Sequence, residues 1–221
     1  WSSDVCSSDL FSVGSFRSSV SENRPSLDIA RAMSIKMGVL GAGQMGLGIA
    51  QTAAQSGFGV WLADVGMEQA TKGRDKIAAQ LSKLVEKGKL ASGEKDAALA
   101  RIAPVGTIRE LSECDLIVEA VSENPELKSK IFKELDAAAK PTAILASNTS
   151  SISITWIAAQ TRRPERVAGM HFMNPVPIMK LVEGIRGIQT SDETFAKVRE
   201  ISEKMGKTFV EAKDFPGFAV N

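Results

Sequence analysis

The apolar residues of this chain come in short runs that alternate with longer amphipathic stretches from Lys36 onward. Short apolar runs are typical of strands that are buried on both faces of a sheet. Segments of this kind predict strands at Met37–Leu40, Gly59–Ala63, Leu116–Val118, Ala143–Leu145, Val167–Met170, Leu181–Ile185 and Thr208–Val210.

Helical periodicity fills the stretches between these strands. In the long segment before Gly88, the residues Ile77, Leu81, Leu84 and Val85 share one face. Pro125 stands where a helix start tolerates proline best, and Asp192 is expected to cap the last helix. The other predicted helices are Met45–Gln55, Gly93–Arg101 and Ile152–Ala159. Repeated strand–helix units of this length predict an α/β fold with a doubly wound, mostly parallel sheet.

The first 34 residues differ from the rest of the chain. Ten serines fall within positions 1–26 and no periodicity persists, so we expect a disordered or non-native leader at 1–34. Three interpretations stay open. The segment could be a transit peptide, although its acidic residues disfavour this, or a natural disordered tail. It could also be the translated remnant of a sequencing library, with the natural start at Met33 or Met37. Residues 35–221 are expected to form the folded domain, and an apolar segment that stops at Asn221 is typical of a fragment.

Charge and composition argue against several classes of function. The 27 basic and 26 acidic residues nearly balance, so nothing favours a nucleic-acid partner or an anionic membrane surface. No apolar run approaches the roughly 20 residues that span a bilayer. The two cysteines make neither a disulfide framework nor a metal cluster, and no metal site is predicted. Few cysteines and no secretory segment favour a cytoplasmic location, with the mitochondrial matrix as the alternative.

A glycine-rich segment lies between the first predicted strand and the first predicted helix. Its sequence, Gly-Ala-Gly-Gln-Met-Gly at 41–46, fits the phosphate-binding pattern G-x-G-x-x-G. Gly41 permits the tight turn, Gly43 lets the backbone approach a pyrophosphate, and Gly46 lets the helix pack on the strand. This context predicts a dinucleotide-binding fold of the Rossmann type.

The choice of dinucleotide depends on the next strand. The helix start at Gln44 and Met45 offers N–H groups to the diphosphate. Asp64 ends the following strand, where its carboxylate is expected to accept hydrogen bonds from the adenosine ribose hydroxyls. A 2′-phosphate at that place meets a like charge, so the sequence predicts NAD rather than NADP as the cofactor.

His171 is the only histidine of the sequence, and it stands at the end of a predicted strand, where open α/β sheets place their sites. The prolines of His171–Pro177 fix an irregular loop after it. Glu183 follows after a turn that is expected to bring it back beside the ring, where a carboxylate fixes the tautomer and stabilises the protonated imidazole. Histidine has an unperturbed pKa of about 6.5, so it suits a general base near neutral pH.

Several segments together resemble the N-terminal NAD-binding domain of the 3-hydroxyacyl-CoA dehydrogenase family, of the 3-hydroxybutyryl-CoA dehydrogenase type. They are Gly41–Ala50, Glu119–Glu123, Ala146–Ser151, His171–Pro177, Met179–Glu183 and Pro216–Phe218. The resemblance runs from Ile35 to Asn221. It implies reversible, NAD-dependent oxidation of (S)-3-hydroxyacyl-CoA to 3-ketoacyl-CoA, in fatty-acid or butanoate metabolism.

The resemblance also implies what is absent. The family continues into a C-terminal helical domain that makes the dimer contact, so the full-length parent is expected to be a homodimer. We expect the isolated chain, without that domain, to bind NAD but to turn over poorly.

The resemblance implies a catalytic role for four residues. His171 takes the hydroxyl proton during oxidation and returns it during reduction, and Glu183 orients His171 and balances its charge. Ser150 and Asn221 hydrogen-bond the reacting oxygen or its surroundings.

Further residues are implied to bind the cofactor or the substrate. Glu123 and Lys128 match positions that contact the nicotinamide half of NAD, and Asn148 lies near both ligands. Implied substrate contacts are Ser150, Asn174, Lys83 and Lys87. The two lysines belong to a helical region that receives the CoA phosphates in the family, and they share one helix face.

Three alternatives stay open. A dehydrogenase of short 3-hydroxy acids without CoA shares the phosphate loop, but the lysine base of that relative, in a glycine-rich helix start, has no counterpart here. A non-catalytic binding module keeps the fold, but the presence of His171, Glu183, Ser150 and Asn221 argues against it. A multifunctional fatty-oxidation protein carries another domain before this one, of which the serine-rich leader gives no sign.

Overall fold

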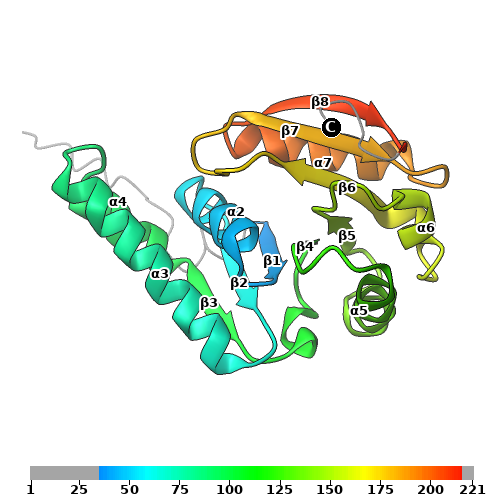
Figure 1. Ribbon diagram of the computed structural model, residues 1–221, viewed down its shortest axis with the longest axis horizontal. Coiled ribbons are helices and arrows are strands. Elements are labelled where there is room, and N and C mark those ends of the chain that lie inside the picture. Colours follow the sequence, from blue (N-terminus) through cyan, green and yellow to red (C-terminus); the bar gives the residue numbers. More distant parts are fainter. Residues whose placement is uncertain (1–34, 216–221) are drawn as a thin grey trace, which may run out of the picture. The chain divides into compact units, whose positions relative to one another are not determined.

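Eight strands form one sheet in the computed structural model, which describes residues 35–215 (Figure 1). They are β1 (Lys36–Leu40), β2 (Gly59–Ala63), β3 (Ile102–Val105), β4 (Leu116–Glu119), β5 (Ile144–Ser147), β6 (Val167–Phe172), β7 (Leu181–Arg186) and β8 (Thr208–Lys213). Their order is β3-β2-β1-β4-β5-β6-β7-β8, and the neighbouring strands are parallel except for β6 and β7. Because β1 pairs with β2 on one side and β4 on the other, the winding reverses there, and ligands bind such sheets beyond the carboxyl ends of these two strands.

Helices cover both faces of this sheet (Figure 1). They are α2 (Gln44–Gln55), α3 (Met67–Glu86), α4 (Ser92–Ala100), α5 (Pro125–Ala138), α6 (Ile154–Ala158) and α7 (Asp192–Lys204), with the short 3-10 helices η1 (Ile108–Leu111) and η2 (Pro164–Arg166). One hydrophobic cluster packs α2, α3 and α7 against one face, and a second packs α5 and α6 against the other. The predicted doubly wound, mostly parallel α/β fold is confirmed.

The predicted strands are all present, with ends shifted by a few residues, but β3 was not predicted. This strand has only four residues, one of which is Pro104, so its sequence carries little strand signal. Proline is tolerated because β3 lies at the edge of the sheet.

Two helix starts show how local sequence sets the boundaries. Pro125 is the first residue of α5, as predicted, and the side chain of Asn124 caps this helix by accepting the N–H of Leu127 at 2.7 Å. At α7 the prediction that Asp192 is the cap is wrong. Ser191 is the cap, and Asp192 lies in the first turn, where a negative charge complements the helix dipole.

The expectations for the leader at 1–34, for Pro216–Phe218 and for Asn221 lie outside the described residues. Of the helices between residues 35 and 215, none combines the length and apolarity needed to cross a membrane. In the same range, no cluster of three or more His, Cys, Asp or Glu side chains is arranged to hold a metal ion.

Candidate active site

The phosphate loop joins β1 to α2 as predicted. Gly41 has a φ of +108°, which L side chains rarely adopt, and its N–H donates to the Ala63 carbonyl oxygen at 2.8 Å. A Cβ at Gly46 would lie 1.8 Å from the Gly41 carbonyl oxygen, whereas a Cβ at Gly43 would meet nothing within 4 Å. Gly41 and Gly46 are therefore required by the loop itself, and Gly43 leaves open space beside the helix start.

The start of α2 suits an anion. The helix begins at Gln44 with no side-chain cap and no acidic residue in its first turn. The first N–H groups of a helix have no partner within the helix and favour an anion. Asp64, at the end of β2, accepts the N–H of Ala42 and, at 2.7 Å, that of Val65. Its carboxylate thereby links the end of β2 to the phosphate loop.

A cavity of about 460 Å³ runs past these residues. It is lined by Gly41, Gly43 and Asp64 on one side and by Ala120, Val121 and part of α5 on the other. A dinucleotide with a free ribose 2′-hydroxyl requires three features, and all are present here. They are the open space at Gly43, the uncapped helix start and the acidic side chain that follows β2. The residues present therefore fit NAD.

His171 and Glu183 face each other across the pairing of β6 and β7. Nδ1 of His171 lies 2.8 Å from Oε2 of Glu183, whose side chain is fully buried. The predicted return of Glu183 beside the ring is confirmed. When Nδ1–H donates to this carboxylate, the neutral imidazole has its lone pair on Nε2, the nitrogen that accepts a proton.

A second cavity, of about 380 Å³, brings together six of the residues that the sequence assigned to the site. They are Met45, Glu123, Asn148, Ser150, His171 and Asn174. Ala120 and Val121 line this cavity as well as the one beside Asp64. A ligand that crosses the carboxyl ends of β1 and β4 therefore contacts both the phosphate loop and the histidine.

Two side-chain hydrogen bonds tie the segments around His171 together. Oδ1 of Asn148 accepts the N–H of Phe172 at 2.9 Å, which links the loop after β5 to the residue beside His171. Nε2 of Gln44 donates to Oδ1 of Asn174 at 3.0 Å, which links the start of α2 to the loop after β6. The cofactor loop and the strand that carries His171 are thus connected by side-chain hydrogen bonds.

Glu123 holds the loop that carries Ser150. Its Oε1 accepts the N–H groups of Ser150 and Ser151 at 3.0 and 3.1 Å, and the hydroxyl of Thr149. Burial raises the pKa of Glu123, but the hydrogen bond from Thr149 and the ammonium of Lys128 outweigh burial and hold that pKa below its ordinary value. An ionised Glu123 therefore keeps this loop in place near neutral pH.

Lys128 lies beneath Glu123 and is not part of the cavity wall. Its side chain is 1% exposed, and its Nζ lies 2.6 Å from Oε1 of Glu119 and 3.5 Å from Oε2 of Glu123. Direct contact with the cofactor, which the resemblance implies, stays a prediction that this burial does not favour. Sequence reasoning missed Glu119, whose signal is an acidic residue at the end of an otherwise apolar strand.

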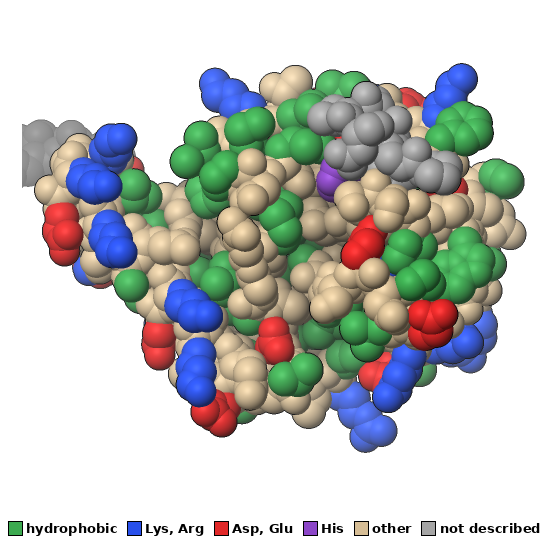
Figure 2. Space-filling model, viewed as in Figure 1, with side chains coloured by type: hydrophobic (Ala, Val, Ile, Leu, Met, Phe, Trp, Pro, Cys, Tyr) green, Lys and Arg blue, Asp and Glu red, His purple; other side chains and the backbone are tan. Residues whose placement is uncertain are grey.

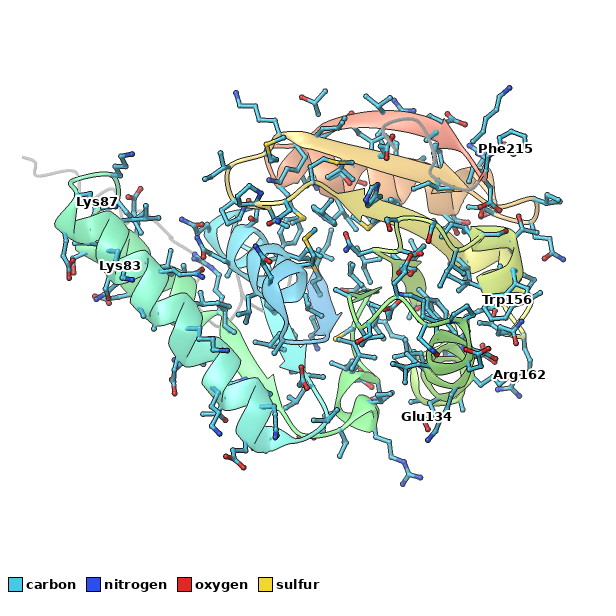
Figure 3. The ribbon with its side chains drawn as sticks, viewed as in Figure 1. Lys83, Lys87, Glu134, Trp156, Arg162 and Phe215 are labelled. Atoms are coloured by element: carbon cyan, nitrogen blue, oxygen red, sulfur yellow. The ribbon has the colours of Figure 1, made fainter. Side chains whose placement is uncertain are left out.

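Lys83 and Lys87 lie apart from both cavities. Figure 3 shows them near the carboxyl end of α3, beside α4, and both are exposed. On the face that Figure 2 shows, Lys and Arg side chains lie along α3 with Asp and Glu side chains among them. The contact of these two lysines with the CoA phosphates stays a prediction.

These features define a Rossmann-type NAD-binding domain with a histidine–glutamate pair across β6 and β7, at the carboxyl end of β6. Residues 36–215 match the model of the family described as 3-hydroxyacyl-CoA dehydrogenase, NAD binding domain. The chain therefore belongs to this family, as its motifs indicated, and NAD is its cofactor.

Individual relatives agree with this assignment. A probable 3-hydroxybutyryl-CoA dehydrogenase from Bacillus subtilis (strain 168) is 54% identical over 183 residues, which make up 83% of this chain and 64% of the relative. The 3-hydroxyadipyl-CoA dehydrogenase of Escherichia coli (strain K12) is 44% identical over 83% of this chain and 38% of its own length. The crystal structure of (S)-3-hydroxybutyryl-CoA dehydrogenase from Ralstonia eutropha is 47% identical, has a TM-score of 0.82, and is matched over 84% of this chain and 66% of that one. This chain thus spans two thirds or less of the length of these relatives.

Proposed function

We propose that this chain carries the cofactor site and the catalytic base of an NAD-dependent 3-hydroxyacyl-CoA dehydrogenase. The reaction is the reversible oxidation of (S)-3-hydroxyacyl-CoA to 3-ketoacyl-CoA. The observation that carries the proposal is the His171–Glu183 pair, because His171 lines a cavity that shares Ala120 and Val121 with the cavity of the phosphate loop. Two of the relatives described above are named for 3-hydroxybutyryl-CoA and one for 3-hydroxyadipyl-CoA.

His171 supplies the acid–base chemistry. NAD, when bound, supplies the acceptor for the hydride that the substrate carbon loses. The proton of the substrate hydroxyl passes to Nε2 of His171 in oxidation and returns from it in reduction. A positioned base of this kind contributes roughly 10²–10⁴ in rate.

Glu183 orients His171 for this proton transfer. Its buried carboxylate accepts Nδ1–H, which directs Nε2 to the proton of the substrate, and its negative charge stabilises the imidazolium that forms. The site therefore holds a proton without creating an unpaired buried charge.

Ser150 lines the same cavity as His171, where its hydroxyl is suited to bind the reacting oxygen of the substrate. The same role for Asn221 rests on the resemblance alone. A homodimeric parent, a cytoplasmic location and a place in fatty-acid or butanoate metabolism also belong to this proposal and rest on the sequence.

Oxidation of NADH with acetoacetyl-CoA, followed by NADH absorbance, tests the function. The rate of NADH oxidation is measured for this chain and for a form extended beyond Asn221. The His171→Ala variant of each form is measured in the same way. We expect turnover that His171→Ala lowers by about 10²–10⁴, with NAD affinity kept. Confirmed NAD binding without turnover in the extended form, or turnover that is unchanged in His171→Ala, contradicts the proposal.

A further inference from the structure

A buried lysine contacts the loop that joins β6 to β7. Lys207 directly precedes β8 and is 8% exposed. Its Nζ donates hydrogen bonds to the backbone carbonyl oxygen of Val176 and, at 2.9 Å, to that of Met179. Burial lowers the pKa of Lys207, and no acidic side chain within residues 35–215 counteracts that effect. The ammonium group is therefore held by backbone carbonyl groups and not by a carboxylate.

The stability of the fold does not explain why Lys207 is buried. Removing an ammonium group from water without a carboxylate partner costs free energy, and hydrogen bonds to carbonyl oxygens offset only part of that cost. An apolar side chain of similar length avoids the cost. The contacts of Lys207 are therefore better explained by the segment that they hold in place.

This segment is a tight turn at residues 175–179. The N–H of Met179 donates to the carbonyl oxygen of Pro175 at 2.9 Å, which closes the turn. Directly after the turn, the carbonyl oxygen of Lys180 accepts the N–H of Thr208, the first residue of β8, at 2.8 Å. The start of β8 thus holds the turn through the side chain of Lys207 and through a neighbouring backbone hydrogen bond.

The turn also packs against α2. Val176 is 2% exposed, and a Cβ at Gly48 of α2 would lie 2.7 Å from its Cβ. The backbone of α2 can approach the turn this closely only because residue 48 is a glycine. Close packing on α2 and the hydrogen bonds of Lys207 together leave the turn little freedom.

The turn lies in the chain between the two members of the proposed acid–base pair, His171 and Glu183. Asn174, the residue directly before the turn, lines the cavity of His171. Its Oδ1 accepts a hydrogen bond from Nε2 of Gln44 at 3.0 Å. Any shift of the turn therefore moves a side chain of the cavity wall.

We infer that Lys207 is a positioning residue, which fixes the turn at 175–179 and through it the place of Asn174 beside His171. Lys207 is not among the residues that line the cavity of His171, so it acts through the turn. The inference rests on the proposed function, since Asn174 belongs to the wall of the cavity in which that reaction takes place.

Lys207→Met tests the inference in the form extended beyond Asn221. Methionine keeps the length of the side chain but donates no hydrogen bond. We expect a folded protein whose kcat with NADH and acetoacetyl-CoA is about 10-fold lower, because a displaced group beside the reacting atoms costs rate. Binding of ADP-ribose, which lacks the nicotinamide, is expected to stay within about twofold, since other segments line the cavity beside Asp64. A comparable loss of ADP-ribose affinity overturns the inference.

The same change in an Asn174→Ala background distinguishes positioning from a general structural role. If Lys207 acts through Asn174, Lys207→Met lowers kcat less than about twofold once residue 174 is alanine, because effects that share one pathway do not add. A purely structural residue lowers kcat by the same factor in both backgrounds. Equal factors therefore overturn the inference.

Lys204→Met is the matched control. Lys204 is the last residue of α7, its side chain is 55% exposed, and its Nζ lies 2.6 Å from Oε1 of Glu200. Exposed ion pairs of this kind contribute little, so kcat is expected to stay within about twofold. A loss of kcat equal to that of Lys207→Met contradicts a specific role for Lys207.

Lys207→Gln keeps the inference testable if Lys207→Met does not fold. Its amide group is uncharged and still donates hydrogen bonds, but the side chain is shorter, so the turn shifts to reach it. We expect kcat to fall at least about threefold, and this loss to disappear in the Asn174→Ala background. An unchanged kcat in Lys207→Gln, or in a folded Lys207→Met protein, overturns the inference. Failure of the proposed function is distinguishable, because then the unaltered protein lacks turnover that depends on His171.

Discussion

His171 and Glu183 are cross-strand partners in the pairing of β6 with β7, and this register places Nδ1 2.8 Å from Oε2. The separation is therefore fixed by two paired strands and not by a loop. The next residue of β7, Gly184, leaves room for β8, since a Cβ there would lie 1.8 Å from the ring of Phe209. The carboxylate of Glu183 is fully buried.

Glu183→Gln tests how much the charge at this position matters. The amide oxygen can still accept Nδ1–H, but it does not neutralise an imidazolium. We expect kcat to fall about 10²–10⁴-fold, as the loss of a carboxylate beside a catalytic histidine does in other enzymes, with NAD affinity kept. Steady-state kinetics with acetoacetyl-CoA and a cofactor titration measure the two quantities.

Glu211→Gln is the control for that change. Glu211 lies on β8, is 53% exposed, and pairs with arginines on the surface. Its replacement is expected to leave kcat within about twofold, because exposed ion pairs contribute little. Equal kcat values for Glu183→Gln and the unaltered protein would show that the carboxylate does not assist His171.

The two glycines Gly43 and Gly46 are predicted to respond differently to alanine. A Cβ at Gly46 would lie 1.8 Å from the Gly41 carbonyl oxygen, so Gly46→Ala must move backbone and is expected to lower the free energy of unfolding by about 1–3 kcal/mol. Gly43 has open space and a φ of −75°, so Gly43→Ala is expected to fold normally.

Both variants are expected to lose NAD affinity. In Gly43→Ala, the added methyl group occupies the space for the pyrophosphate. Urea unfolding and a cofactor titration separate the two effects. Normal NAD affinity in Gly43→Ala would refute the assignment of this loop to the pyrophosphate.

Much of this fold could be predicted because single residues carry strong local signals. The phosphate loop, Pro125 at a helix start and the apolar runs fix where most elements begin. The cap of α7 was placed one residue late, because both Ser191 and Asp192 are good cap residues and sequence does not show which side chain reaches back to the Thr194 N–H.

The candidate site was predictable only as far as its motif residues. Glu119 and Lys128 each resemble an ordinary charged residue in the sequence, one after an apolar strand and one on an amphipathic helix. Their pairing depends on how α5 packs against β4 and β5, which is tertiary information. The antiparallel direction of β7 is of the same kind, because its apolar pattern does not encode direction.

Asp64→Asn tests the preference for NAD. The amide keeps the size of the side chain but removes the charge that is expected to exclude a 2′-phosphate. We expect NAD to bind about 10-fold more weakly, and the ratio of NADP to NAD affinity to rise by at least that factor. The exposed Asp75→Asn on α3 is the control, and an unchanged affinity ratio in Asp64→Asn argues against this role.

Lowering the pH is expected to remove the stabilisation that Asp136 gives to the folded state. Its buried carboxylate accepts hydrogen bonds from Nε of Arg162 at 3.0 Å and of Arg163 at 2.7 Å. Burial raises the pKa of Asp136, but the two arginines outweigh it and hold the pKa below its ordinary value of 3.8. Because the folded-state pKa is lowered, the stabilisation is complete above the unfolded value and is lost as pH falls through the folded one.

Asp136→Asn removes that pH-dependent contribution. We expect it to lower the free energy of unfolding by about 2 kcal/mol near neutral pH, and the difference from the unaltered protein to shrink as pH falls through the lowered pKa of Asp136. Urea unfolding at several pH values measures this difference. Asp96→Asn, at a side chain that is 69% exposed, is the control and should change little at any pH. A difference that stays constant from neutral to acidic pH would mean that Asp136 stabilises the fold through its shape rather than through its charge.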